Sequence, residues 1–208
     1  GAIERLVAVA GRDPSLGAVG PRLLNSDGTP QVSTGPFPQA LFRFLPSRFE
    51  QAYERRVQDQ VQASPDQLAD VDWLAGAALL FRREVYQRVG GLDERYYMWY
   101  DDLDWAQKLR RAGYRSVYVG DAVIVHHGRQ SGGRLENRRL AEQLFDSEYT
   151  YLRLHHGRLT VCLVFALRLV KALLRRCLPL GQPAREEAAW RLAYHRSHFR
   201  RFCLGRLP

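Results

Sequence analysis

The sequence has 208 residues, of which 46% are hydrophobic and 25% are charged, and its formal net charge is +9. These values are ordinary for a soluble globular protein of one or two domains. The three cysteines all lie in the last quarter of the chain, which argues against a disulfide framework and fits a reducing compartment. No apolar run approaches the ~20 residues that a membrane-spanning helix needs.

The positive charge is confined to the last third of the chain. Residues 1–146 contain 19 basic and 19 acidic residues, whereas residues 147–208 contain 12 basic and 3 acidic ones. Such a basic segment favours an anionic partner, either a membrane surface or nucleic acid. No recognised nucleic-acid-binding motif accompanies it. We therefore expect a cytoplasmic protein that contacts the anionic inner face of the plasma membrane peripherally, with no nucleic-acid partner.

The first part of the chain predicts a helix followed by two strands. Ala2–Ala10 has the spacing of an amphipathic helix, whose apolar face would consist of Ile3, Leu6, Val7 and Ala10. Leu16–Leu24 predicts a strand, Asp27-Gly28 a turn, and Pro30–Ser33 a short return strand.

The middle of the chain predicts alternating strands and helices after a weakly patterned stretch. Residues 34–69 predict a variable loop with a helix near Phe49–Gln62. The elements predicted after it are a strand over Asp70–Phe81 that is interrupted at Gly76-Ala77, helices over Arg83–Val89 and Leu103–Ala112, and strands over Ser116–Val119 and Ala122–Val125. Gly90 and Gly113 stand where helix-ending glycines are expected.

Three helices are predicted for the remainder, over Leu135–His156, Leu159–Leu178 and residues 184–202. The second is largely apolar, and its basic positions fall broadly on one side: Arg168, Lys171, Arg175 and Arg176. Two interpretations stay open. The helix either lies in a membrane interface, or packs on the domain with a solvated basic face.

A cluster of acidic and aromatic residues occupies the centre of the sequence. Asp101, Asp102 and Asp104 fall within four positions, and five large rings surround them, namely Tyr96, Tyr97, Trp99, Tyr100 and Trp105. His126 and His127 follow at the end of a predicted strand. Carboxylates among large rings, with histidines nearby, are typical of a sugar or nucleotide site. The alternative is that one aspartate caps the helix and Asp104 is solvated in its first turn.

The segment Val71–Ser131 resembles the second half of the catalytic domain of glycosyltransferase family 2, in particular its rhamnosyltransferase-like members. Gly-Ala between apolar runs, Gly-Gly-x-Asp-Glu, aromatics, an Asp-Asp-x-Asp cluster, Ala-Gly-Tyr and a final histidine occur in the family's order. The resemblance implies an α/β protein with a partial GT-A fold. Residues 1–134 would form its acceptor-side half, and residues 135–208 a basic tail of amphipathic helices. We expect a fragment that lacks the N-terminal donor-binding half and is inactive alone.

The resemblance also implies an inverting glycosyltransferase. It would transfer a sugar, with rhamnose among the candidates, from a nucleotide-sugar donor to a cell-envelope or lipid-linked glycan acceptor. Asp102 aligns with the family's general base, Asp101 replaces the usual Glu beside it, and Asp104 completes the acidic trio. His126 matches a histidine that ligates a divalent metal, Mg²⁺ or Mn²⁺, in some members, and His127 is the second candidate.

Four further residues are expected at the substrate. The rings of Trp73, Trp99 and Tyr100 either stack on sugar faces or belong to the core, and Gly76 allows close approach of a backbone or ligand. We expect the acidic trio and the histidine pair to line one shared hollow.

Two other functions stay open. One is a non-catalytic module that binds a membrane surface or a glycan. The other is a metal-dependent phosphohydrolase built from Asp102, Asp104 and His126, although hydrolases of that class usually have more ligands than this chain provides.

Overall fold

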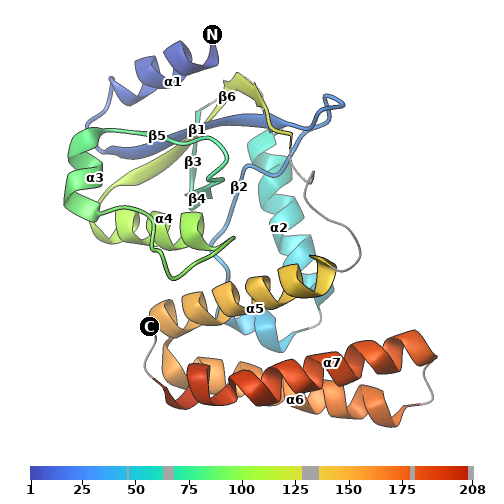
Figure 1. Ribbon diagram of the computed structural model, residues 1–208. Helices are drawn as coiled ribbons and strands as arrows, with labels where there is room; N and C mark the ends of the chain where they lie inside the picture. The colour runs from blue at the N-terminus through green and yellow to red at the C-terminus, as the bar shows by residue number, and fades with distance from the viewer. Residues whose placement is uncertain (46, 63–67, 128–135, 179–180, 206–208) are drawn as a thin grey trace.

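The protein is a mixed α/β structure, and the computed structural model describes residues 1–45, 47–62, 68–127, 136–178 and 181–205 (Figure 1). Its elements in chain order are α1 (Ala2–Ala10), β1 (Leu16–Leu24), β2 (Thr34–Gly35), the 3₁₀ helix η1 (Ala40–Phe44), α2 (Ser47–Gln62), β3 (Leu68–Val71), β4 (Trp73–Leu74), β5 (Leu80–Phe81), α3 (Arg83–Val89), α4 (Asp101–Arg111), β6 (Arg115–Val125), α5 (Glu136–His155), α6 (Gly157–Cys177), α7 (Gln182–Phe199) and the π-helix η2 (Arg200–Leu204).

The described strands form one four-stranded sheet in the order β3-β6-β1-β5 and a separate ladder of β2 with β4. The two central strands, β1 and β6, are parallel, whereas both edge strands are antiparallel to their neighbours. The nearly continuous apolar run of β1 suits a strand that is covered on both faces of its sheet.

Side chains alternate along β6 and build two cores. Val117 and Val119 pack with α1 on one face of the sheet, whereas Tyr118 packs with Trp105 and Leu109 of α4 on the other face. This alternation follows from the two-residue period of a strand. The sheet is therefore covered by α1 on one side and by α3 and α4 on the other.

The prediction of two strands after α4 was wrong, because β6 is one strand with a bulge. Pro21 of β1 pairs with Val119, and the next residue, Arg22, pairs with Val123. The residues Gly120 to Ala122 are thus extra in β6 and stay within a single ladder. In the bulge, the Asp121 carboxylate pairs with Arg5 of α1 at 2.6 Å.

Two other strand predictions and one helix face also need correction. The stretch predicted as a strand from Asp70 to Phe81 is divided among β3, β4 and β5. The return strand is reduced to a single bridge between Leu24 and Pro30, since proline has no N–H to extend a ladder. The buried side chains of α1 are Leu6, Val9 and Ala10, and the predicted face members Ile3 and Val7 are exposed.

The helix predictions are confirmed to within a few residues at their ends. Four helices, α2, α4, α6 and α7, begin two residues earlier than expected. Gly113 ends α4 as predicted, with a positive φ of 84°. Its N–H donates to the Arg110 carbonyl at 3.1 Å, and the Tyr114 N–H donates to the Leu109 carbonyl at 3.0 Å. This pair of bonds is the Schellman motif that a glycine at this position permits.

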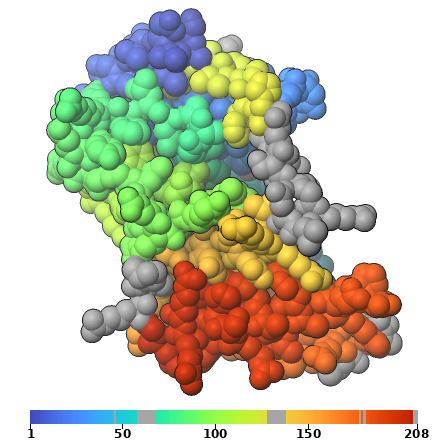
Figure 2. Space-filling view, viewed as in Figure 1, coloured from blue at the N-terminus to red at the C-terminus, as the bar shows by residue number. Residues whose placement is uncertain are grey.

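The C-terminal helices form a layer on the side of the molecule away from α1 (Figure 1). Their core joins α5, α6, α7 and η2 through Phe145, Tyr149, Phe165, Tyr194 and Phe202. In the space-filling view, α7 runs across the base of the molecule with α6 beside it (Figure 2). None of the described helices is both long enough and apolar enough to cross a bilayer.

Three of the four basic side chains that were predicted on one side of α6 are exposed, namely Lys171, Arg175 and Arg176, and Arg168 is the exception. Arg168 is turned inward, where its Nη2 donates to both carboxylate oxygens of Glu148 at 2.9 and 2.8 Å. Beside these exposed cations lies an exposed apolar stripe. We call it the α6 stripe, and its members are 49% to 73% exposed: Leu159, Leu163, Val170, Leu173 and Leu174.

Candidate functional site

Asp102 lies in the first turn of α4, where the helix dipole favours negative side chains. Its Oδ2 accepts a hydrogen bond from the Gly76 N–H at 3.0 Å, and its Oδ1 accepts one from the Leu103 N–H at 2.8 Å. The carboxylate is partly buried, so these two backbone donors hold it in one orientation. Gly76, predicted to allow a close approach, is thus placed directly beside Asp102.

The surroundings of Asp102 strengthen it as a proton acceptor. Burial raises the pKa of this carboxyl above its ordinary value of 3.8, the Gly76 N–H acts in the opposite direction, and the neighbouring charge of Asp101 raises the pKa further. A carboxylate with a raised pKa takes a proton more readily than an ordinary aspartate.

The segment that precedes α4 is held in a strained conformation. Trp99 and Tyr100 have φ values of 61° and 64°, in the left-handed region that side chains other than glycine rarely adopt. Each such residue costs about 1–2 kcal/mol. Contacts with helix α5 hold this conformation. Ser147 Oγ donates to the Met98 carbonyl at 2.7 Å, and the Tyr151 ring lies 5.4 Å from that of Tyr100.

The predicted sugar-stacking rings have different surroundings. Trp99 is 41% exposed and lies two residues before Asp101, where a ligand could reach its ring. Tyr100 packs against Tyr151 instead. The indole N–H of Trp73 donates to the Pro36 carbonyl at 3.0 Å, so this ring is committed to the β2–β4 region. Contact with a sugar stays a prediction for all three rings.

Asp104 faces a different side of α4 from Asp102, and its role as a catalytic residue stays a prediction. Two residues of helix turn a side chain by about 200°, and Asp104 is only 1% exposed as a result. Its Oδ2 pairs with Lys108 at 2.8 Å, and its Oδ1 lies 2.7 Å from His155 Nε2 and 3.4 Å from Tyr96 Oη. Asp104 therefore joins α4 to α5.

The hydrogen bonds of His155 define its protonation. Its Nδ1 lies 2.9 Å from Arg111 Nη2, which can only donate, so Nδ1 is the acceptor. The proton is then on Nε2, which donates to Asp104. Burial raises the pKa of Asp104, but the hydrogen bonds from His155 and Lys108 outweigh it and lower the pKa overall. Sequence reasoning assigned no role to His155.

His126 extends from the end of β6 toward the turn at residues 25–31. Its Nδ1 lies 2.7 Å from Gln31 Oε1, and the same amide donates through Nε2 to Asn25 Oδ1 at 3.0 Å. The second bond fixes the orientation of the Gln31 amide, so His126 Nδ1 carries the proton. Its Nε2 then presents a lone pair, which is the state of a metal-ligating histidine whose other nitrogen is held by a neighbour.

His127, the second candidate metal ligand, has Nδ1 2.7 Å from Ser26 Oγ. A hollow of about 560 Å³ beside His126 is lined by residues 25–27 and 30–32 and by none of the three aspartates. This hollow does not join the histidines to the acidic trio, so a shared hollow stays a prediction. Within the described part of the chain, no three His, Cys, Asp or Glu side chains gather closely enough to hold a metal ion.

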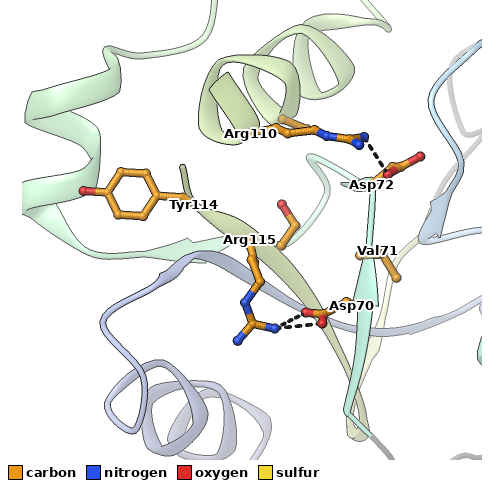
Figure 3. A pocket seen from close by; sticks show the side chains of 8 residues that line it. Asp70, Val71, Asp72, Arg110, Tyr114 and Arg115 are labelled. Atoms are coloured by element: carbon orange, nitrogen blue, oxygen red, sulfur yellow. Dashed lines mark hydrogen bonds and ion pairs between the residues drawn. The ribbon is translucent and has the colours of Figure 1, made fainter. Parts of the chain in front are cut away.

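A smaller hollow of about 170 Å³ lies near the other end of α4 (Figure 3). Its charged groups neutralise one another, since Arg110 pairs with Asp72 at 3.2 Å and Arg115 with Asp70 at 2.5 Å. Arg110 follows Asp101 by nine residues, about 14 Å along a helix. We assign this hollow a structural role in joining β3 to α4 and β6.

Comparisons with known proteins agree with the resemblance. The sequence model of the family described as "Glycosyltransferase like family 2" matches residues 1–144. An N-acetylglucosaminyl-diphospho-decaprenol L-rhamnosyltransferase of Mycobacterium tuberculosis is 35% identical over 166 residues, which cover 76% of this chain and 52% of that protein. The rhamnosyltransferase WbbL of Escherichia coli is 39% identical over 57 residues, 27% of this chain and 22% of that protein.

A hexosyltransferase of low-salt glycan biosynthesis, Agl10 of Haloferax volcanii, is 24% identical over 63% of this chain and 36% of that protein. The chain thus spans about half the length of the mycobacterial relatives that it matches. The family match includes the strands, α4 and the segment that carries Asp101 and Asp102, and it ends within α5. On this evidence, the chain belongs to glycosyltransferase family 2, and its relatives include rhamnosyltransferases.

Proposed function

We propose that the protein is an inverting glycosyltransferase that moves a sugar, with rhamnose as the first candidate, from a nucleotide-sugar donor to a lipid-linked glycan acceptor of the cell envelope. The chain would supply the acceptor side of a GT-A fold. Family membership and the printed activities of the relatives support this proposal. The structural observation that carries it is the Asp102 carboxylate, oriented by the Gly76 N–H and raised in pKa by burial.

In this proposal Asp102 is the general base. It takes the proton of the acceptor hydroxyl while the hydroxyl oxygen attacks the anomeric carbon of the donor sugar. The bond from that carbon to the nucleoside diphosphate breaks on the opposite face, so the anomeric configuration inverts. The exposed ring of Trp99, close to the base in the chain, would orient the acceptor sugar.

A divalent cation, Mg²⁺ or Mn²⁺, would stabilise the charge of the departing diphosphate. His126 fits one ligand position, because its Nδ1 is held by Gln31 and its Nε2 lone pair is open. The described residues provide no group of three ligands, so the other ligands would have to come from the donor phosphates or from elsewhere in the protein.

The experiment for this proposal is a transfer assay with the gene product in its full length. We expect nucleotide-activated rhamnose and an N-acetylglucosaminyl-diphospho-polyprenol to give one added sugar of inverted anomeric configuration, detected by mass spectrometry and NMR. A chelator should stop the reaction, and Mn²⁺ or Mg²⁺ should restore it. A product with retained configuration, or hydrolysis of the donor without transfer, would contradict the proposal.

We also propose that the protein lies on the anionic inner face of the plasma membrane through the α6 stripe. Leu163→Ser combined with Leu174→Ser should lower binding to vesicles that contain anionic lipid by ~100-fold or more, because burial of each leucine side chain contributes about 1.5–3 kcal/mol. The measurement is co-sedimentation. Leu41→Ser combined with Leu92→Ser, at exposed positions outside α6, is the control. Equal binding by both double variants would remove the membrane role of α6.

A further inference from the structure

A cationic hollow of about 490 Å³ lies between α6, α7, η1 and the start of α2, outside the site described above. Five basic side chains line it, namely Arg43, Arg168, Lys171, Arg175 and Arg191, and Glu50 is the acidic residue on its wall. Its volume is within the range of small-molecule sites. The hollow is formed by residues that are far apart in the sequence, so it could not be predicted from the sequence pattern.

The inner end of the hollow is balanced in charge. Glu148 pairs with Arg43 at 3.1 Å and with Arg168 at 2.8 Å, and Glu50 also pairs with Arg43. Two basic groups thus face two acidic ones. Even so, Arg43 Nε and Arg168 Nη1 have no hydrogen-bond acceptor among the described residues.

The outer part of the hollow carries surplus positive charge. Lys171 and Arg175 are four residues apart, one turn of α6, and neither pairs with an acidic group in the described part of the chain. The third cation there is Arg191, which pairs with Glu187 of the same helix at 2.7 Å. Adjacent Lys and Arg side chains without acidic partners are suited to bind phosphate oxygens.

We propose that this hollow binds the diphosphate of the lipid-linked acceptor, a ligand that follows from the proposed function. The lipid source is favoured because the helix that supplies Lys171 and Arg175 also carries the α6 stripe on its outer face. An acceptor lipid with its tail in the membrane would present its phosphates at the level of these two side chains.

The hollow is also connected to the candidate base. Ser147 of α5 donates to the carbonyl of Met98, three residues before Asp101, at 2.7 Å. The next residue of α5, Glu148, pairs with Arg43 and Arg168 at the inner end of the hollow. In a lipid-linked sugar, the phosphates are one sugar ring away from the reacting hydroxyl. A diphosphate held in the hollow would therefore direct its sugar toward the segment that carries Asp102.

Binding is tested first with inorganic pyrophosphate and the full-length gene product, by isothermal titration calorimetry. Lys171→Gln combined with Arg175→Gln should weaken pyrophosphate binding by at least ~10-fold, because each lost bond is charge-assisted. Arg158→Gln combined with Arg176→Gln removes the same charge from exposed positions of α6 outside the hollow and should change binding less than ~2-fold. Equal loss in both double variants, or no pyrophosphate binding at all, would overturn the proposal.

The source of the diphosphate is tested in the transfer assay. Pyrophosphate should compete with the lipid-linked acceptor, and the Lys171/Arg175 variant should raise the KM for that acceptor ~10-fold with the donor KM unchanged. Competition with the nucleotide sugar that is lost in the Lys171/Arg175 variant would overturn the lipid assignment. Pyrophosphate binding that depends on Lys171 and Arg175 in a protein without transfer activity would contradict the proposed function and leave the anion site standing.

Discussion

Asp102→Asn should lower the rate of sugar transfer by ~10²–10⁴-fold, the usual contribution of a general base. The amide has nearly the shape of the carboxylate, and its oxygen can still accept the Gly76 N–H, but it cannot take a proton from the acceptor hydroxyl. Because the change does not alter groups that hold the donor, the Kd for the nucleotide sugar should stay within ~2-fold. Steady-state transfer rates and donor titrations of the full-length protein measure the two quantities.

The matched control is Glu94→Gln, a carboxylate-to-amide change at an exposed position eight residues earlier, which should leave turnover unchanged. Stability gives a second check. The folded-state pKa of Asp102 is raised, so its contribution to stability is full below the unfolded pKa of about 3.9 and is lost as pH rises through the folded value. At neutral pH the amide removes the buried charge, but its one oxygen can accept from only one of the two backbone N–H groups, so its free energy of unfolding should stay within ~1 kcal/mol of the wild type. Turnover above a few per cent of wild type would show that Asp102 is not the base.

Asp104→Ala should lower the free energy of unfolding by ~3 kcal/mol, because it leaves a buried His155 N–H without its acceptor and removes the nearer of the two carboxylates that pair with Lys108. Asp101→Ala, in the same turn but partly exposed, should cost less than ~1 kcal/mol. Urea denaturation of the chain measures both. A smaller loss for Asp104→Ala than for Asp101→Ala would contradict the structural role of Asp104.

The effect of Asp104 should also depend on pH. Its folded-state pKa is lowered, so its contribution is present above the unfolded pKa of about 3.9 and is lost as pH falls through the folded value. The stability difference between wild type and Asp104→Ala should therefore be constant near neutral pH and shrink below about pH 4. A difference that grew as the pH fell would mean that the carboxyl is protonated in the folded protein.

Much of the fold could be predicted from local patterns. Hydrophobic periodicity located α1, α3 and the C-terminal helices, and glycines marked the ends of α3 and α4. The bulge at Gly120 to Ala122 could not be predicted, since Gly-Asp has the composition of a turn and only pairing with β1 shows that the strand continues. The inward turn of Arg168 likewise depends on Glu148 of another helix.

The candidate site was only partly predictable. The order of the motif identified Asp102, and its place beside Gly76 follows from the fold. Asp104 was grouped with it by proximity in sequence, although the helical repeat already indicated a different face. His155 lies 51 residues from Asp104, so their contact depends on how α5 packs. The sequence from Tyr151 to Gly157, which has the pattern Tyr-x-x-x-His-His-Gly, was the signal that could have drawn attention to His155.

The most direct measurement of the central claim is the pH dependence of kcat/KM for sugar transfer by the full-length protein. If Asp102 is the base, activity should fall in acid with the titration of one group whose pKa is above the ordinary 3.8 of an aspartate. That acid limb should disappear from the residual activity of Asp102→Asn. An identical acid limb in both proteins, or activity that stays constant down to the ordinary aspartate pKa, would contradict the assignment.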